Sequence, residues 1–388
     1  MDEARVTESK QPPGRRVLIA PDKFKGSLSA RSVASAIATG IRRARRDVAL
    51  DLCPVADGGE GTLEAAISAG FRRIPVEVEG PTGKPVKAAY GERGGVALVE
   101  LAEAVGLGRL ADDQLAPLTA STYGAGQLID AAIRAGNKTI VLAIGGSATS
   151  DGGAGLVEAL GAELLDIDGK PVSRGGGSLT MIDRIDFESM RARLAGVKFV
   201  IASDVNSPLL GPDGAAAVFG PQKGASLSDV NRLERGLTRW AEVVTTATST
   251  DVSQRPGAGA AGGVGFGAMA LLEASIVPGA DVVLEMVNFA DRARKSSLVI
   301  TGEGSLDEQT LFGKAPVRVA SAAKEIGTPV VAVVGRCTVA EVKLAPLGIH
   351  KVYELRTLEP DLSRSIAFAR TYIANISEQL AAIELDGL

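Results

Sequence analysis

Short runs of apolar residues recur along this chain, and they constrain its fold more than any other feature of the sequence. The runs occupy residues 17–20, 139–144, 199–202, 298–300 and 330–334. The last four are each followed by Gly, Ser or Thr, and several lead into an Ala-rich stretch with helical spacing. Uninterrupted apolar runs of this length are typical of buried parallel strands. Their alternation with helices predicts an α/β protein with a mainly parallel sheet.

The two ends of the chain share this pattern, whereas the middle contains hairpin-like segments rich in Gly and Pro. A length of 388 residues suits two domains. We expect a doubly wound domain of the Rossmann or flavodoxin-like kind, built from residues 15–82 and 288–388. Residues 83–287 are expected to form an inserted second α/β domain. The polar segment 1–14, which ends in Pro-Pro-Gly, is expected to be a disordered tail.

The composition excludes several classes of protein. A net charge of −4 argues against nucleic-acid binding, and 4% aromatic residues leave little material for base stacking. Cys53 and Cys337 stand alone, and His350 is the one histidine, so neither a disulfide scaffold nor a His-rich metal site is expected. No window holds 18 uncharged apolar residues, and the first residues lack an apolar signal core. We therefore expect a cytoplasmic protein with no membrane contact.

Glycine-rich turns that open predicted helices are the first candidate binding sites. Gly makes up 47 of 388 residues, about 12% where roughly 7% is usual. The turns lie at residues 57–61, 145–155, 257–267 and 302–304. Backbone N–H groups at the start of a helix attract anions, phosphate included. Because three of the four turns also contain carboxylates, phosphate binding is favoured over simple turn formation.

Two of these turns repeat one pattern, and a third matches a known fingerprint. Residues 57–65 and 151–159 both read DGGxGxxEA, which places an Asp and a Gly-rich turn before a helix. Residues 257–262 read GAGAAG, which fits the GxGxxG of dinucleotide-binding folds. No strand is predicted before Gly257, so an NAD-dependent dehydrogenase remains only an alternative. A non-catalytic binding protein for a small acid is the second alternative.

Carboxylates and lysines cluster where predicted strands end. Asp57 and Glu60, Asp204, and Glu303 with Asp307 all lie in such loops. Carboxylates gathered at the carboxyl ends of strands suit Mg²⁺, which takes one or two of them together with substrate phosphates. Helix capping is the competing role, and for Asp151 it is at least as good an explanation. Lysines beside glycines in these loops are candidates for contacts with phosphate or carboxylate groups. They are Lys23, Lys25, Lys223 and Lys314.

Six ordered segments resemble the bacterial glycerate kinase family (type 1). They are APDKFKGSLSA at 20–30, PVADGGEGT at 54–62, AIGGSATSDGGAG at 143–155, FGPQKGA at 219–225, PGAGAAGGVG at 256–265 and TGEGSLDEQTLFGK at 301–314. Many members of that family carry Ser where this chain has Lys23. The resemblance implies ATP-dependent phosphorylation of D-glycerate, with 2-phosphoglycerate favoured over 3-phosphoglycerate. It also implies a two-domain α/β fold; a homodimer is left open.

Phosphoryl transfer requires alignment and charge neutralisation more than covalent chemistry. We predict Asp204 as the base for the glycerate hydroxyl, with Lys25 and Lys223 as the other catalytic residues. Glu303 and Asp57 are predicted to bind Mg²⁺. The predicted ATP-binding residues are Gly145, Gly146, Ser147, Asp151, Gly152, Gly153 and Lys314. The predicted substrate-binding residues are Asp57, Gly58, Gly59, Glu60, Gly262 and Gly263.

Overall fold

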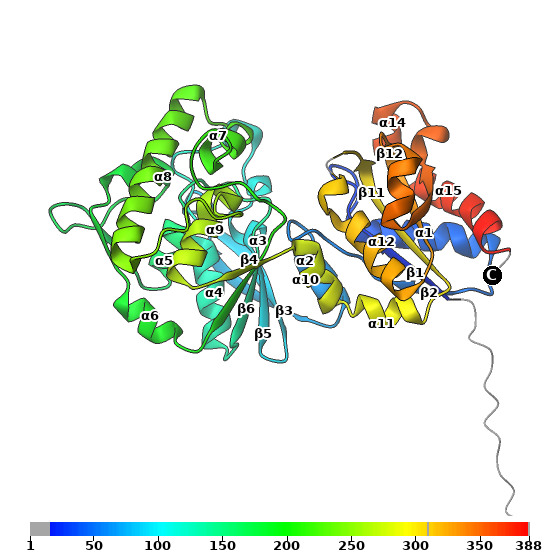
Figure 1. Cartoon of the computed structure of the whole chain (residues 1–388), viewed down its shortest axis with the longest axis horizontal. Helices are drawn as coiled ribbons and strands as arrows, with labels where there is room; N and C mark the ends of the chain where they lie inside the picture. Colours follow the sequence, from blue (N-terminus) through cyan, green and yellow to red (C-terminus); the bar gives the residue numbers. More distant parts are fainter. Residues whose placement is uncertain (1–15, 309, 387–388) are drawn as a thin grey trace, which may run out of the picture. The chain divides into compact units, whose positions relative to one another are not determined.

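The computed structural model describes residues 16–308 and 310–386, which form two units (Figure 1). The first unit takes the chain up to Val55 and again from Asn288, and the second runs from Ala56 to Val287. The strand at Arg72–Glu79 pairs with the sheet of the second unit, so residues 56–82, which the sequence analysis assigns to the first domain, lie in the second unit. The expected tail, residues 1–14, lies outside the described residues.

The first unit is built on a five-stranded parallel sheet. In spatial order its strands are β13 (Ile349–Glu354), β12 (Val330–Cys337), β11 (Leu298–Leu306), β1 (Arg16–Pro21) and β2 (Ala49–Leu52). Counted along this unit alone, the order is 5-4-3-1-2, which is the flavodoxin-like doubly wound order that the sequence analysis expects. The chain winds outward in one direction from β1 and in the other from β11. These two neighbours therefore define the topological switch point, where doubly wound sheets bind their ligands.

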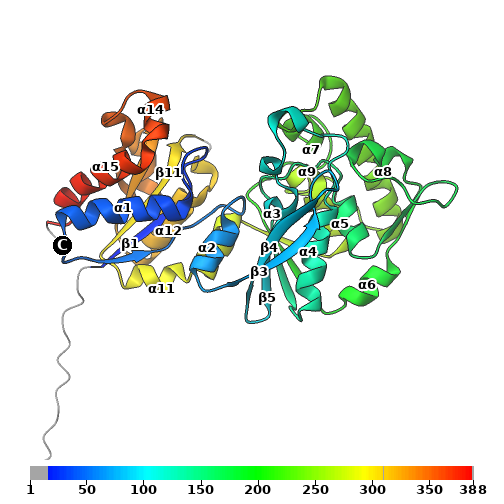
Figure 2. The same cartoon turned by 180° about the vertical axis from the view of Figure 1, so that it is seen from behind.

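Helices cover both faces of this sheet. Helices α1 (Ala30–Ala44) and α15 (Ala369–Glu384) pack together on the face turned forward in Figure 2, and α12 (Ala315–Ile326) lies on the opposite face. Ser29 caps α1 by accepting from the amide of Ser32, and a left-handed Gly327 ends α12. The other helices of the unit are α11 (Phe289–Arg294), α13 (Glu341–Leu344) and α14 (Leu362–Ala367).

The second unit contains a six-stranded mixed sheet. Its strands, in spatial order, are β10 (Ser275–Val277), β9 (Lys198–Ala202), β6 (Thr139–Ala143), β5 (Val96–Glu100), β4 (Pro85–Arg93) and β3 (Arg72–Glu79). The strands from β10 to β5 are parallel, whereas β3, β4 and β5 form antiparallel hairpins around the expected Gly/Pro segments. A separate two-stranded sheet pairs β7 (Glu163–Leu165) with β8 (Arg184–Asp186).

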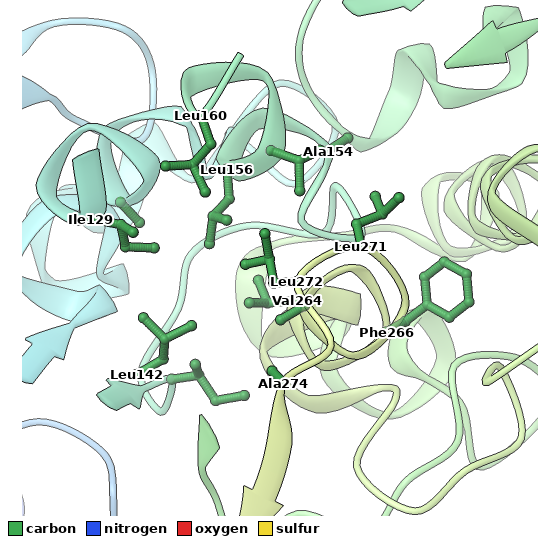
Figure 3. Packing of buried hydrophobic residues seen from close by; sticks show 14 of the residues in the cluster. Ile129, Leu142, Ala154, Leu156, Leu160, Val264, Phe266, Leu271, Leu272 and Ala274 are labelled. Carbon is green, nitrogen blue, oxygen red and sulfur yellow. The ribbon is translucent and has the colours of Figure 1, made fainter. Parts of the chain in front are cut away.

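Alternate residues of the central strands pack into two different hydrophobic cores, one on each face of the sheet. Ile140 and Leu142 pack into the larger core, part of which Figure 3 shows, whereas Val141 and Ala143 pack on the other face with Leu63 and Met286. Helices α2 (Thr62–Ser68) and α10 (Gly279–Met286) cover that second face. The remaining helices of the unit are α3 (Leu101–Val105), α4 (Tyr123–Arg134), α5 (Ala154–Ala159), α6 (Glu188–Leu194), α7 (Ala215–Phe219), α8 (Leu227–Thr248) and α9 (Ala260–Leu271).

Across residues 16–308 and 310–386, no helix combines the length and the apolar character that crossing a membrane requires.

Candidate functional site

The switch point of the first unit carries two buried carboxylates. Strands β1 and β11 run in register with Pro21 beside Gly302, so Asp22 follows β1 at the level of Glu303. The amide of Asp22 extends this pairing by donating a 2.8 Å hydrogen bond to the carbonyl of Gly302. Asp22 is 6% and Glu303 8% exposed. The parallel register therefore places two acidic side chains at the position where this fold binds its ligands.

Glu303 is held in place by the segment that follows its strand. The hydroxyl of Thr310 donates a 2.6 Å hydrogen bond to Oε1 of Glu303. Burial raises the pKa of Glu303 to about 7; the carboxylates of Asp22 and Asp307 add to the rise, and Thr310 and Lys314 oppose it. Burial therefore disfavours the ionised form of this carboxyl group, and a cation bound nearby would favour it.

The predicted lysines of the first unit lie in the loops around this pair. Lys25 is exposed in the loop after β1, and Gly304 lets that loop approach β11: a β-carbon on Gly304 would lie 3.5 Å from the amide nitrogen of Lys25. The loop is also fixed by Ser27, whose hydroxyl donates to the carbonyl of Ile366. Lys314 precedes α12, with its ammonium 3.9 Å from Asp307. The first unit thus brings Lys25, Glu303 and Lys314 to one edge of its sheet.

In the second unit, two predicted Gly-rich loops touch each other. The amide of Gly145 donates to the carbonyl of Gly58 at 3.1 Å. A β-carbon on Gly145 would lie 2.6 Å from Cα of Gly59, and one on Gly58 would lie 2.6 Å from the carbonyl oxygen of Ala202. Glycine is therefore required where these loops meet the ends of β6 and β9. Glu60 is exposed, and its Cγ would lie 3.2 Å from a β-carbon on Gly146.

Asp57 and Asp204 approach the same point, the start of α10. Oδ1 of Asp204 accepts a 3.0 Å hydrogen bond from the amide of Gly279. A β-carbon on Gly279 would lie 2.1 Å from the carbonyl oxygen of Asp57, so Asp57 passes against the same residue. Both aspartates are partly exposed. The second unit thus brings the backbone of Asp57 and the carboxylate of Asp204 to the start of α10, at the carboxyl end of its parallel strands.

Asp151 is enclosed by donors and completely buried. Its carboxylate accepts from the amide of Thr122 at 2.8 Å, from the hydroxyl of the same residue, and from the amides of Gly153 and Gly155. Burial raises the pKa of Asp151, although these hydrogen bonds favour its ionised form. These contacts join the starts of α4 and α5, which is the capping role weighed in the sequence analysis.

Lys223 lies behind the 145–155 loop. It is 2% exposed, and its ammonium donates a short hydrogen bond to the carbonyl of Thr149. Burial lowers the pKa of Lys223 to about 8, and the charge of Asp151 acts in the opposite direction. A β-carbon on Gly262 would lie 2.9 Å from this ammonium, and one on Gly263 would lie 2.8 Å from Cα of Gly152. Lys223 therefore joins the two loops from within.

The GxGxxG segment does not form a dinucleotide-binding turn. The segment before Gly257 follows α8 and contains no strand. Inside α9, Ala261, Gly262 and Gly263 all have left-handed dihedral angles, which interrupt the helix. A strand leading directly into a tight turn is required for the fingerprint to cradle a pyrophosphate. These glycines therefore form a break within α9 and not a dinucleotide-binding turn.

The predicted metal ligands Glu303 and Asp57 belong to different units. Within the described ranges, no group of three or more Asp, Glu, His or Cys side chains is arranged to hold a metal ion by itself. Sequence reasoning missed three residues: Asp22, Thr310 and Glu100, whose carboxylate accepts from the amides of Gly61 and Leu63 at the start of α2. The signal for Asp22 was present, because it follows a predicted strand as Asp57 does.

The chain resembles known proteins over most of its length. Residues 17–384 match the family model described as the glycerate kinase family. A glycerate kinase of Halalkalibacterium halodurans is 45% identical over 82% of this chain and 85% of its own length. A glycerate 2-kinase of Escherichia coli K12 is 41% identical over 95% of this chain and 97% of its own.

A crystal structure described as a candidate glycerate kinase 2 from Salmonella typhimurium LT2 has a similar fold. It superposes with a TM-score of 0.82 at 39% identity, and the match covers 96% of this chain and 99% of that one. Matches of this length include both units, from the first strand to the last helix. The chain belongs to the glycerate kinase family.

Proposed function

We propose that this enzyme transfers the γ-phosphoryl group of ATP to D-glycerate, with Mg²⁺, and that 2-phosphoglycerate is the favoured product. The family match supports a kinase with a small organic acid as acceptor. The preference for the 2-hydroxyl is supported by the E. coli relative, which is named a glycerate 2-kinase. The observation that carries the proposal is the placement of Asp22 and Glu303 at the switch point of the first sheet.

The residues of the first unit fit a divalent cation and phosphates. Mg²⁺ binds proteins through one or two carboxylates and completes its shell with water and phosphate oxygens. Glu303 supplies a buried carboxylate of this kind, with Asp22 beside it. Bound there, the metal would neutralise charge on the phosphates. Lys25 and Lys314 offer two further positive groups at the same edge of the sheet.

The second unit supplies the proposed base. Asp204 accepts from Gly279 through one oxygen, which fixes the orientation of its carboxylate at the end of β9. In the proposed step, Asp204 takes the proton of the glycerate hydroxyl as that oxygen bonds to the γ-phosphorus. The bond between the γ-phosphorus and the bridging oxygen breaks, and ADP leaves with the electron pair.

The loops beside Asp204 are proposed to bind the small molecules. Residues 145–153 are proposed to hold ATP phosphates, and residues 57–60 with Gly262 and Gly263 the glycerate. Glycine amides at a helix start suit anions, and Gly146 is the exposed glycine of the 145–153 loop. Because Asp151 and Lys223 are buried and engaged inside the unit, we propose that they act by shaping these loops. The dehydrogenase alternative loses its basis, since no strand leads into Gly257.

A coupled assay of ADP release tests the proposal. The reaction would contain ATP, Mg²⁺ and D-glycerate, with L-glycerate, no-acceptor and metal-chelated controls. We expect ADP release that depends on both D-glycerate and Mg²⁺. Equal rates with and without D-glycerate, in a folded sample, would contradict the proposed acceptor.

A further inference from the structure

The segment after β11 is tied to Glu303 through one threonine. Thr310 is fully buried at the start of the 3-10 turn Thr310–Phe312. Its hydroxyl donates to Oε1 of Glu303 at 2.6 Å and accepts from the amide of Asp307 at 3.2 Å. The amide of Thr310 in turn donates to the Asp307 carbonyl at 2.9 Å and lies 3.3 Å from its carboxylate. One side chain therefore joins the end of the strand to the segment that follows it.

Lys314, in the same segment, brings a positive charge near Asp307 and Glu303. The amide of Lys314 donates to the carbonyl of Thr310 at 3.3 Å, and the Lys314 ammonium lies 3.9 Å from Asp307. Burial disfavours the ionised form of Glu303, and the charges of Asp22 and Asp307 act in the same direction. A carboxylate buried among like charges needs a donor to fix its orientation, and the Thr310 hydroxyl is such a donor.

We infer that Thr310 is a positioning residue for the phosphoryl-transfer reaction: its hydroxyl holds the Glu303 carboxylate and Asp307 in one arrangement at the switch point. This inference rests on the proposed function, because Glu303 is proposed there to bind the cation. Thr310 touches neither substrate nor metal in this account. It acts through Glu303, as groups that hydrogen-bond to metal-binding carboxylates do.

Thr310→Val tests the inference, because valine keeps the shape of threonine and removes the hydroxyl. We expect kcat to fall by about 10- to 100-fold, as when the partner of a metal-binding group is removed. The KM for glycerate should stay within about twofold, since Thr310 is not proposed to contact glycerate. Thr310→Ser restores the hydroxyl and should recover most of the turnover.

Thr328→Val is the matched control. Thr328 is also buried in the first unit, and its hydroxyl donates to the carbonyl of Ala293 at 3.1 Å, away from Glu303. Thermal unfolding should show similar losses of stability for both valine variants, while only Thr310→Val slows turnover. Turnover of Thr310→Val within about twofold of the wild type, or equal impairment of the valine and serine variants, would overturn the inference.

Hydrogen exchange separates this inference from the proposed function. Without any substrate, the amide of Asp307 should exchange faster in Thr310→Val than in the wild type and slow again in Thr310→Ser, because the hydroxyl accepts from it. Unchanged exchange across residues 305–314 in Thr310→Val would overturn the anchoring role. A wild type without turnover on glycerate would count against the proposed function, and the exchange comparison would still decide the role of Thr310.

Discussion

Asp57 and Asp151 begin the same nine-residue pattern, and each accepts a hydrogen bond at Oδ1 from the glycine amide two residues later, at 3.3 Å and 3.2 Å. In both, a left-handed glycine ends the turn and a helix begins. Their surroundings differ: Asp151 is fully buried against Thr122, whereas Asp57 is partly exposed. The same local motif therefore supports a structural role at one position and leaves a carboxylate accessible to ligands at the other.

Asparagine at these two positions should separate the two roles. Asp151→Asn places an amide NH₂ among donors, so we expect the free energy of unfolding to fall by about 1–3 kcal/mol. Asp57→Asn should change stability by less than about 0.5 kcal/mol, as partly exposed substitutions do, and should lower turnover. Urea denaturation and the ADP-release assay measure the two effects. Equal losses of stability in both variants would contradict this division.

Asp204→Asn tests the proposed base. Asparagine keeps an oxygen that can accept from the amide of Gly279, so the fold should persist. It cannot take a proton, and we expect kcat to fall by about 10²- to 10⁴-fold, the usual contribution of general acid–base catalysis. Asp213→Asn, at an exposed aspartate of the same unit, should be neutral. Near-normal turnover of Asp204→Asn would remove Asp204 from this role.

Lys223 should make stability depend on pH. Its folded pKa, about 8, lies below the ordinary value near 10.4, so between these pH values the unfolded chain holds a proton that the folded protein has released. The contribution of Lys223 to the free energy of unfolding therefore rises with pH through this window, by about 3 kcal/mol at most. Denaturation of the wild type and Lys223→Met at pH 7 and pH 10 measures it.

We expect the wild type to gain stability relative to Lys223→Met over that pH range. Lys198→Met, at an exposed lysine of the same unit, should show no such change. A difference between the wild type and Lys223→Met that stays constant with pH would mean that the buried ammonium keeps its ordinary affinity for protons.

Gly145→Ala tests the contact between the two loops of the second unit. The new β-carbon would lie 2.6 Å from Cα of Gly59, so the loops must separate. We expect a loss of about 1–3 kcal/mol in the free energy of unfolding, as for other overpacked sites, with weaker ATP binding. Gly108→Ala is the matched control, because its β-carbon would meet only the end of the Glu60 side chain, at 3.7 Å. Equal stability of the two variants would contradict the close packing of the two loops at Gly145.

Local signals were sufficient to predict several elements of the fold. The apolar runs at 17–20 and 330–334 became β1 and β12. Helix α12 begins beside Pro316 and ends at Gly327, residues that favour the start and the end of a helix. The first domain boundary could not be predicted in this way. It depends on the pairing of β3 with β4 and on contacts of the 57–61 loop with Gly145 and Gly279, which are distant in sequence.

The candidate site was predictable as a set of motifs but not as a set of contacts. Asp204 and Lys25 follow β9 and β1, where the parallel pattern predicts them. Glu303, which was expected in a loop, lies within β11 instead, just beyond the pairing of β11 with β1. The contact of Lys223 with Thr149 spans 74 positions, so no local pattern distinguishes an engaged lysine from one facing a ligand. The role of Thr310 could not be predicted from a local pattern either, because it depends on the register of β1 and β11, which places Glu303 beside Asp22.

Phosphorus NMR of one reaction mixture of enzyme, ATP, Mg²⁺ and D-glycerate observes the transferred group itself. We expect the ATP signals to be replaced by those of ADP and of a phosphomonoester that matches 2-phosphoglycerate. ATP consumption without a glycerate phosphoester, or a mixture in which ATP persists although the enzyme is folded, would contradict the proposed function.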